Sequence, residues 1–281
     1  MRFIQTDRGD CPIHLACFVM GISTSTYYAL TKRSAKVIDH NTWRLCQRMK
    51  ELFIQSRQSY GSRRLMKALR KEGFKIGRCR VRSLMKRLGI VVKKKKRFVI
   101  TTDSRHNFPV AENHLDRQFQ PASKNQAWAS DITYLWTTQG WVYLAVVIDL
   151  YSRRVVGWHC DKRMTQSLVI RALMMAINLR PQTKGLLHHS DRGSQYASHA
   201  YQKLLKQHGI ICSMSRKGNC WDNAPTERFF SSLKREWLTG NTYATREAVI
   251  NDVNSYMKFY NQNRLHSTIN DMSPINYEKC S

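Results

Sequence analysis

Three acidic residues in the second half of the chain occupy positions where a carboxylate is costly to bury. Asp131 interrupts an apolar and aromatic stretch typical of a strand, and Asp191 follows a short apolar strand. Glu227 lies on a helix expected to begin near Asp222 and Asn223. An unpaired carboxylate is unfavourable in an apolar setting unless a cation or a hydrogen-bond donor lies beside it. The pattern therefore indicates that these side chains gather around a bound cation.

The type of these ligands favours a hard, oxygen-seeking ion. No paired His and Cys ligands accompany the carboxylates, so Mg²⁺ or Mn²⁺ is expected rather than zinc. Two such ions about 3.5–4 Å apart can activate an attacking oxygen and stabilise the leaving oxygen of a phosphodiester. We expect Asp131 to bridge two ions, with Asp191 and Glu227 holding one each. For any one carboxylate alone, the alternative is a surface or capping role.

The helix around Glu227 is predicted to separate its apolar and polar residues. At about 100° per residue, with Glu227 at zero, Lys234 falls near 340° and Asn223 near 320°. Four apolar residues fall between about 200° and 300°, the side expected to pack on the sheet. These are Phe229, Phe230, Leu233 and Trp237.

The pattern of residues 124–281 predicts an α/β domain with a mixed five-stranded sheet, flanking helices and a C-terminal helical tail. The first three strands are expected to form an antiparallel meander. The predicted strands cover 127–136, 141–150, 153–159, 185–188 and 210–212, and the predicted helices cover 165–179 and 195–208. No GxGxxG or GxxxxGK[ST] string occurs, so a glycine-rich nucleotide loop is unsupported.

The chain is strongly basic, with 47 Lys+Arg against 19 Asp+Glu and a formal net charge of +28. This excess disfavours a metabolic enzyme for small neutral substrates and indicates a polyanionic partner, most simply nucleic acid. The charge is uneven: residues 1–120 contain 27 basic and 8 acidic residues, and residues 121–281 contain 20 and 11. The first part is therefore expected to hold DNA.

Residues 40–97 are predicted to form a basic region of the helix-turn-helix type. Ser62 is expected to cap a helix over 63–71, and a second helix over 78–88 is expected to end at Gly89. Apolar residues form one stripe of the second helix, and basic residues occupy the rest. A plain helical hairpin is the alternative. The candidate DNA contacts of this helix are Arg78, Arg82 and Lys86.

Two further segments of the basic half have predicted roles. Residues 1–35 resemble part of another helix-turn-helix, with helices over 15–20 and 24–30. The basic run 93–97 is predicted to follow DNA phosphates, with a nuclear signal or a solvated tail as alternatives. Its candidate DNA contacts are Lys94 and Lys95. The polar residues 98–123 are predicted to be a linker.

Several classes of protein are disfavoured. No run of about 18 apolar residues is present, and the first residues lack the apolar segment of a secretory signal. The eight cysteines are scattered without a CxxC pair, which argues against a zinc ribbon and a disulfide scaffold. Reduced, buried cysteines in a cytoplasmic protein are therefore expected.

The strings around the three carboxylates resemble the Asp, Asp, Glu triad of retroviral-type integrase cores. They read WASDITY, HSDRGSQY and NAPTERFFSSLK, with 35 residues between Asp191 and Glu227 and with Lys234 seven residues after the glutamate. The wider strings GNCWDNAPTE and YNQNRLHSTI resemble the second-frame catalytic subunit (OrfB) of bacterial insertion-sequence transposases of the IS-three family. The similarity extends from about residue 11 to residue 278.

This resemblance implies an RNase H-like catalytic core that acts on DNA in two steps. Water would cleave the 3′ ends of the element with Mg²⁺ (or Mn²⁺), and the freed 3′-OH would attack another phosphodiester. The first attack would join the two element ends into a circular intermediate. Asp131, Asp191 and Glu227 would be the metal ligands. Matching positions add four candidate DNA contacts: Lys234, Asn223, Arg264 and His266.

The histidines near these strings each have two interpretations. His188 and His189 either orient the Asp191 carboxylate, as groups behind a metal ligand often do, or only flank the end of a strand. His266 either contacts DNA or is a packed histidine.

The N-terminal part departs from the family pattern. It contains no heptad repeat and no His-His-Cys-Cys zinc module, whereas family members usually act as a frameshift fusion with an upstream subunit carrying a full helix-turn-helix and a zipper. We expect as partners double-stranded DNA, further copies of the chain and an upstream-frame subunit, at the nucleoid of a bacterial cytoplasm. The alternatives are an RNase H-like nuclease without strand transfer and a non-catalytic DNA-binding repressor.

Overall fold

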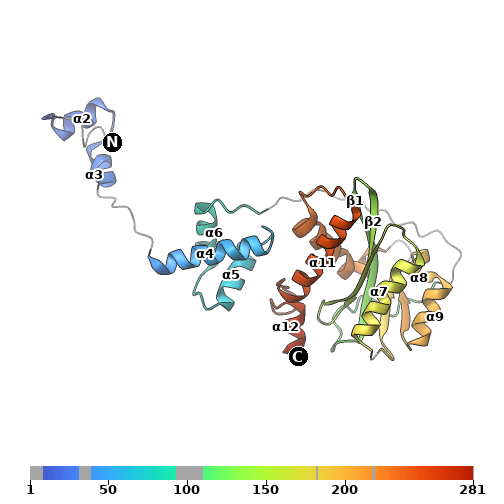
Figure 1. Cartoon of the computed structure of the whole chain (residues 1–281). Coiled ribbons are helices and arrows are strands. Elements are labelled where there is room, and N and C mark those ends of the chain that lie inside the picture. The colour runs from blue at the N-terminus through green and yellow to red at the C-terminus, as the bar shows by residue number, and fades with distance from the viewer. Residues whose placement is uncertain (1–8, 32–38, 93–109, 182, 217–218, 281) are drawn as a thin grey trace. The chain divides into compact units, whose positions relative to one another are not determined.

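The computed structural model describes residues 9–31, 39–92, 110–181, 183–216 and 219–280 (Figure 1). Contacts divide the chain into two compact units, residues 1–47 and 48–281. Each unit is described by itself. The predicted phosphate-following run, with Lys94 and Lys95, lies outside the described residues.

The first unit contains two short helices and the start of a third. These are α2 (Ile13–Val19), α3 (Thr24–Thr31) and α4 (His40–Gln55), which continues into the second unit. Ala16, Cys17 and Tyr27 form a small buried cluster between α2 and α3. Among the described residues no single helix is long and apolar enough to span a membrane. The pair α2 and α3 passes that test only when the two are taken together, and they are bent by 110°.

The second unit begins with a helical pair, α5 (Ser62–Lys71) and α6 (Arg78–Arg87). The predicted apolar stripe of α6 is buried at Val81, Leu84 and Met85. One detail of the prediction is wrong: the N-cap of α5 is Gly61, and Ser62 belongs to the helix. The Ser62 hydroxyl instead accepts a hydrogen bond from Nε of Arg78 at 3.4 Å, so it links the two helices.

A five-stranded mixed sheet forms the centre of the second unit, as predicted. Its order is β3-β2-β1-β4-β5. β1, β2 and β3 pair antiparallel as the expected meander, and β4 pairs in parallel with both β1 and β5. The strands are β1 (Ala127–Thr137), β2 (Gly140–Asp149), β3 (Val155–Asp161), β4 (Leu187–Ser190) and β5 (Ile211–Met214).

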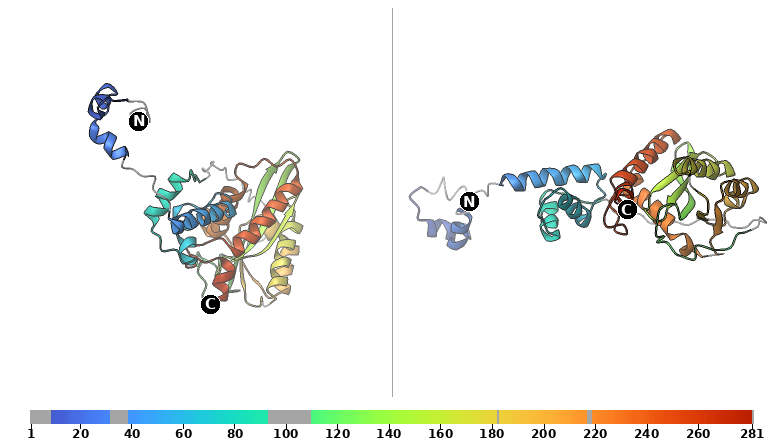
Figure 2. Two further views of the ribbon diagram at one scale, coloured as in Figure 1. Left: turned by 60° about the vertical axis from the view of Figure 1, so that its left-hand side comes forward. Right: turned by 90° about the horizontal axis from the view of Figure 1, so that it is seen from below.

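Helices cover both faces of this sheet, as Figures 1 and 2 show. One face packs against α7 (Gln166–Leu179), α8 (Ser194–Ala197) and α9 (His199–Gln207). The other face packs against α10 (Ala224–Leu233) and α11 (Arg246–Gln262), and α12 (Pro274–Lys279) contacts α11. Because both faces are covered, β2 is apolar and buried along almost its whole length.

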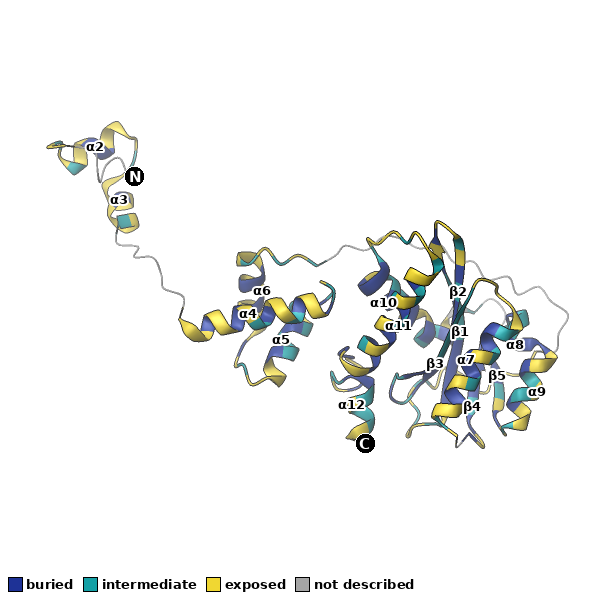
Figure 3. Ribbon diagram, viewed as in Figure 1, coloured by how far each residue is buried: buried dark blue, intermediate teal, exposed yellow. Residues whose placement is uncertain are grey.

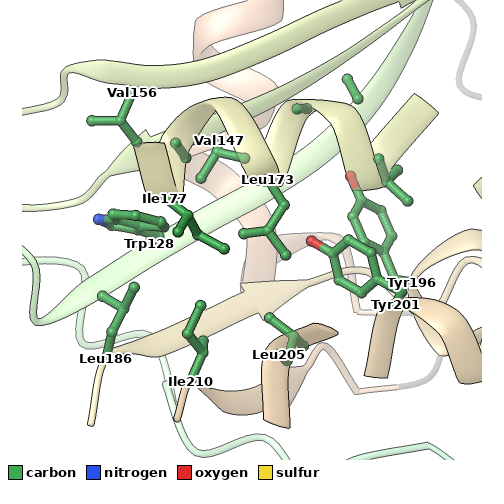
Figure 4. Close-up of a cluster of buried hydrophobic side chains, with 14 of the residues drawn as sticks. Trp128, Val147, Val156, Leu173, Ile177, Leu186, Tyr196, Tyr201, Leu205 and Ile210 are labelled. Carbon is green, nitrogen blue, oxygen red and sulfur yellow. The ribbon is translucent and has the colours of Figure 1, made fainter. Parts of the chain in front are cut away.

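The core beneath α7 is tightly packed, and buried residues follow the strands in Figure 3. Trp128 on β1 and Leu173 and Ile177 on α7 meet there, together with Tyr196 and Tyr201 from α8 and α9 (Figure 4). A further constraint acts at Gly157 of β3, where a Cβ atom would lie 2.1 Å from the carbonyl oxygen of Ala172. Only glycine therefore allows α7 to approach this strand so closely.

Two predicted segments differ from the structure. The single helix expected over 195–208 is two helices, because Ser198 adopts an extended conformation and its hydroxyl accepts from the Tyr201 amide to cap α9. The described part of the expected linker, residues 110–123, has no helix or strand but is not detached. Its Leu115 is 2% exposed, and the Leu115 amide donates to Ser213 Oγ at 3.1 Å. That part therefore belongs to the second unit.

Candidate active site

The first two carboxylates lie on neighbouring parallel strands. β1 and β4 pair in parallel, with Ala129 opposite His189. Asp131 and Asp191 stand two residues further along the two strands, so they emerge at the same edge of the sheet. Burial raises the pKa of the Asp131 carboxyl well above its usual range, and the charge of Asp191 raises it further. The structure thus brings these two carboxylates into electrostatic contact.

Glu227 reaches the same edge from α10, which packs along β1. A short 3₁₀ turn, η1 (Cys220–Asn223), leads into this helix, close to the predicted start. Asn223 caps the helix, and its Nδ2 donates to the backbone oxygen of Ser130 at 3.2 Å. This bond fixes the start of α10 beside the residue that precedes Asp131. Glu227 follows one turn later, and its charge adds to the causes that raise the Asp131 pKa.

The predicted apolar side of α10 faces the sheet. Phe229, Phe230, Leu233 and Trp237 are all buried in one cluster with β2 and α11. The α-helix ends at Leu233 and continues as a five-residue π-helix, η2 (Lys234–Leu238). The assumption of 100° per residue therefore does not hold after Leu233. It nevertheless placed the four apolar residues on the buried side correctly.

Lys234 begins this π-helix and lies near the carboxylates. Its Nζ is 5.2 Å from the centre of the Tyr134 ring on β1. Burial lowers the pKa of the Lys234 ammonium, and attraction to Asp131 opposes that change. The lysine thus supplies a positive charge at one side of an otherwise acidic group.

The donor set fits a divalent cation of the magnesium type. Among the described residues, no group of three or more His, Cys, Asp or Glu side chains is arranged to hold a metal ion. Asp131 is nevertheless desolvated and carries the repulsion of two other carboxylates. Oxygen ligands alone suit Mg²⁺ or Mn²⁺, and a cation between them would remove that repulsion.

Asn223 does not match its expected role as a DNA contact. Its side chain is 5% exposed, and its amide is committed to the Ser130 carbonyl. The reason is its place at the N-cap, between α10 and β1. In the structure Asn223 is a positioning residue for the helix that carries Glu227.

Arg264 and His266 are also interior residues, 5% and 8% exposed. The Arg264 guanidinium bonds to Glu236 through Nε at 2.7 Å and Nη2 at 2.8 Å. Its Nη1 lies 3.1 Å from Nε2 of His266. Burial, followed by the charge of Arg264, lowers the pKa of His266 to about 2. The expected direct DNA contacts are therefore corrected: Arg264 pairs with a carboxylate inside the protein, and His266 is packed and neutral.

His188 and His189 are fully buried. Nε2 of His188 lies 3.1 Å from the hydroxyl of Tyr201. The two ring nitrogens of His189 lie 2.9 and 3.1 Å from the hydroxyls of Ser213 and Ser215. Burial lowers the pKa of His188 to about 3 and that of His189 to about 4. Both are thus neutral packing residues of β4, with ring nitrogens that face the hydroxyls of Tyr201, Ser213 and Ser215.

The remaining expected DNA contacts lie on the exposed side of α6. Arg78, Arg82 and Lys86 are exposed, opposite the buried stripe of that helix. Their positions suit contact with a polyanion, and their role stays a prediction.

Four charged residues near the site were missed from the sequence: Glu236, Arg64, Arg153 and Arg228. Glu236 is 3% exposed and also accepts from Nη1 of Arg64 at 2.8 Å. Its only signal in the sequence is indirect, because a buried arginine at 264 requires a carboxylate partner. Arg228 directly follows Glu227, and Arg153 lies in the β2–β3 turn.

Comparison with protein families gives the class. Profiles described as "Integrase core domain" match residues 121–220 and 208–274, and one described as "HTH-like domain" matches residues 42–98. With the mixed sheet and the three carboxylates at its edge, they define an enzyme of the DDE transposase and integrase class.

Curated relatives give the family. The chain is 40% identical over 264 residues to the "Insertion element IS600 uncharacterized 31 kDa protein" of Shigella sonnei, covering 94% of this chain and 97% of that protein. It is 38% identical over 279 residues to transposase InsF for insertion sequence IS3A of Escherichia coli (strain K12), covering 98% and 97%. The chain therefore belongs to the IS3 family of insertion-sequence transposases.

Solved structures show more distant likenesses. The simian T-cell lymphotropic virus intasome in complex with a PP2A regulatory subunit has a TM-score of 0.49 at 20% identity, covering 62% of this chain and 60% of that one. The trimeric HTLV-2 integrase catalytic core domain in complex with magnesium has a TM-score of 0.46 at 21% identity, covering 57% and 99%.

Proposed function

We propose that this chain cleaves the 3′ ends of an insertion sequence and joins them to another phosphodiester. In the first step water attacks phosphorus and the P–O3′ bond breaks, leaving a free 3′-OH on the element. In the second step that hydroxyl attacks another phosphodiester, and the oxygen it displaces leaves as a new 3′-OH. The observation that carries this proposal is the group of three carboxylates, with Lys234 beside it, at one edge of the sheet.

The residues of the site would have three roles: metal binding, phosphate contact and positioning of α10. Asp131, Asp191 and Glu227, which influence one another electrostatically, would together hold two Mg²⁺ or Mn²⁺ ions. When bound, the ions supply the positive charge that stabilises the attacking and leaving oxygens. Lys234 would contact a phosphate beside the one that is cleaved. Asn223 bonds the start of α10 to the residue before Asp131, which would keep Glu227 near Asp131.

The partners follow from the same proposal. Double-stranded DNA would be bound by α6 through Arg78, Arg82 and Lys86, and by Lys94 and Lys95. Two element ends must meet for joining, so we infer that several copies of the chain assemble on DNA. An upstream-frame subunit is the partner we infer for the first unit, because Phe18 and Val19 on α2 are 81% and 76% exposed. An exposed apolar surface of this kind is typical of an interface.

A joining assay distinguishes this function from its alternatives. A duplex that represents a pre-cut element end is incubated with the chain, Mg²⁺ and an unlabelled target duplex. The proposal predicts joined strands that are longer than the labelled substrate. Shortened strands without joined products would indicate a nuclease, and binding without either product would indicate a repressor.

A further inference from the structure

A pocket of about 230 Å³ lies along α10, and its wall contains four arginines. Arg64 and Arg264 line it together with Arg153 and Arg228, and the first turn of α10 contributes Ala224 and Pro225. The rest of the wall consists of Phe119, Phe229 and Tyr260, of Ser232, Ser267 and Thr268, and of the packed, neutral His266.

The charge of this pocket is only partly compensated. Glu236 pairs with Arg64 and with Arg264. Within the described part of the chain, no carboxylate forms an ion pair with Arg153 or Arg228. Burial lowers the pKa of the Arg153 guanidinium, Tyr260 and Asp149 oppose that change, and the charge of Arg228 adds to it. Arg153 and Arg228 line the same pocket, so an anion between them would reduce the repulsion of their charges.

The backbone of Arg153 gives no reason for an arginine at this position. Its φ angle is 62°, in the left-handed region that favours glycine or asparagine. Its Nη2 donates to the backbone oxygen of Phe119 at 2.9 Å, which turns the guanidinium toward the pocket wall. The requirement at 153 is therefore for the side chain, not for the turn.

The pocket is continuous with the surface of the catalytic helix. A second pocket contains Glu227 and Arg235, and it shares Arg64, Arg228 and Arg264 with the first. Glu227 and Arg228 both line this second pocket, so a DNA strand that lies at Glu227 can also reach Arg228. Guanidinium groups bind phosphate oxygens through paired hydrogen bonds, which suits consecutive backbone phosphates.

We propose that Arg153 and Arg228 bind one phosphodiester of the DNA strand that enters the carboxylate site. This inference rests on the proposed function and adds to it a position for the DNA strand. The ligand is a phosphate group, and its source is DNA rather than free phosphate. The hydroxyls of Ser267 and Thr268 stand in the same wall and can donate to its oxygens.

Neutral methylphosphonate groups, placed one at a time along each strand of an element-end duplex, test this contact. In the unmodified chain, one position near the cleaved end should weaken binding about tenfold or more, as expected for a lost charged hydrogen bond. In Arg228→Gln and in Arg153→Gln the same position should weaken binding little or not at all, because its partner is absent. Arg171→Gln removes an exposed arginine on α7, at the opposite face of the sheet, and should keep the full effect.

Folding controls and a test with inorganic phosphate accompany this experiment. Arg228 is exposed, so Arg228→Gln should unfold at the same temperature as the unmodified chain. If Arg153→Gln does not fold, Arg153→Lys replaces it as a variant that keeps the positive charge. Equal methylphosphonate effects in all variants at every position would overturn the inference. Binding of inorganic phosphate by the chain without such coupling would also overturn it, since the site would then serve free phosphate. Because the readout is binding, failure of the joining reaction would count against the proposed function alone.

Discussion

The guanidinium of Arg264 holds the carboxylate of Glu236 with two hydrogen bonds, from Nε at 2.7 Å and from Nη2 at 2.8 Å. Arg64 on α5 donates to the same carboxylate at 2.8 Å. Glu236 belongs to the π-helix that begins with Lys234. The ion pair therefore connects α5, the segment after α11 and the end of the catalytic helix through one buried group.

Glu236→Gln is expected to destabilise the second unit. Removing one partner of a buried ion pair leaves the other charge uncompensated, at a cost of about 3–5 kcal/mol. The free energy of unfolding in urea at neutral pH measures this loss. Glu247→Gln, at an exposed position in the first turn of α11, is the matched control and should change stability by less than about 0.5 kcal/mol.

The Glu236 carboxylate should make the free energy of unfolding depend on pH in the acidic range. Burial alone would raise the pKa of Glu236, but hydrogen bonds and charges from Arg264 and Arg64 outweigh it and lower the pKa from 4.5 to about 2. A depressed pKa stabilises the folded state above pH 4.5, and the contribution is lost as the pH falls from about 4.5 toward 2. The difference in stability between the unmodified chain and Glu236→Gln should therefore shrink across this range. A constant difference would show that Glu236 is not ionised in the folded protein.

Lys234→Gln should reduce the joining of a pre-cut DNA end by about 10- to 100-fold, because a charged contact to phosphate would be lost. Lys234→Arg keeps the charge and should retain part of the activity. Lys258→Gln changes an exposed lysine of α11 and should leave joining unchanged. Full activity of Lys234→Gln would mean that this ammonium does not act on the DNA.

Replacing Arg78, Arg82 and Lys86 together by glutamine should weaken DNA binding and flatten its dependence on salt. Each lost phosphate contact should reduce the slope of log affinity against log salt by about 0.9. Fluorescence anisotropy at several salt concentrations gives both slopes. An unchanged slope would show that α6 does not contact phosphates.

Gly157→Ala is expected to destabilise the catalytic unit by about 1–3 kcal/mol, since the added methyl group would overlap α7. The Cβ would lie 2.1 Å from the backbone oxygen of Ala172, which can move only with the helix. Gly77→Ala has open space around it and a negative φ of −96°, so thermal unfolding should show a smaller change. Equal shifts for both variants would argue against close packing at Gly157.

The fold and the three carboxylates could be predicted because their signals are local. Asp131 stands in an apolar strand and Glu227 on a helix with one apolar side, and both patterns are visible within about ten residues. The parallel pairing of β1 with β4, which brings Asp191 near Asp131, joins strands about 60 residues apart, and only the resemblance to integrase cores implied it.

The surroundings of the site could not be predicted because they depend on contacts between distant segments. Arg264 pairs with Glu236, 28 residues earlier in the chain. No local sequence pattern indicates which acidic residue is the partner of this arginine. From the sequence, Asn223 looks like an exposed polar residue. In the fold it is buried, because its side-chain amide donates to the Ser130 carbonyl. The residues around Leu115 look like a linker because they lack periodicity, and only the fold shows that they pack.

The carboxylates themselves are tested most directly by joining assays with Asp131→Asn, Asp191→Asn and Glu227→Gln, beside Glu247→Gln as a control. Each of the three changes would remove a proposed metal ligand and leaves every basic side chain in place. The account predicts that all three abolish Mg²⁺-dependent joining and leave DNA affinity within about threefold (under about 0.7 kcal/mol) of the unmodified chain. Substantial Mg²⁺-dependent joining by any one of them would contradict the assignment of the active site.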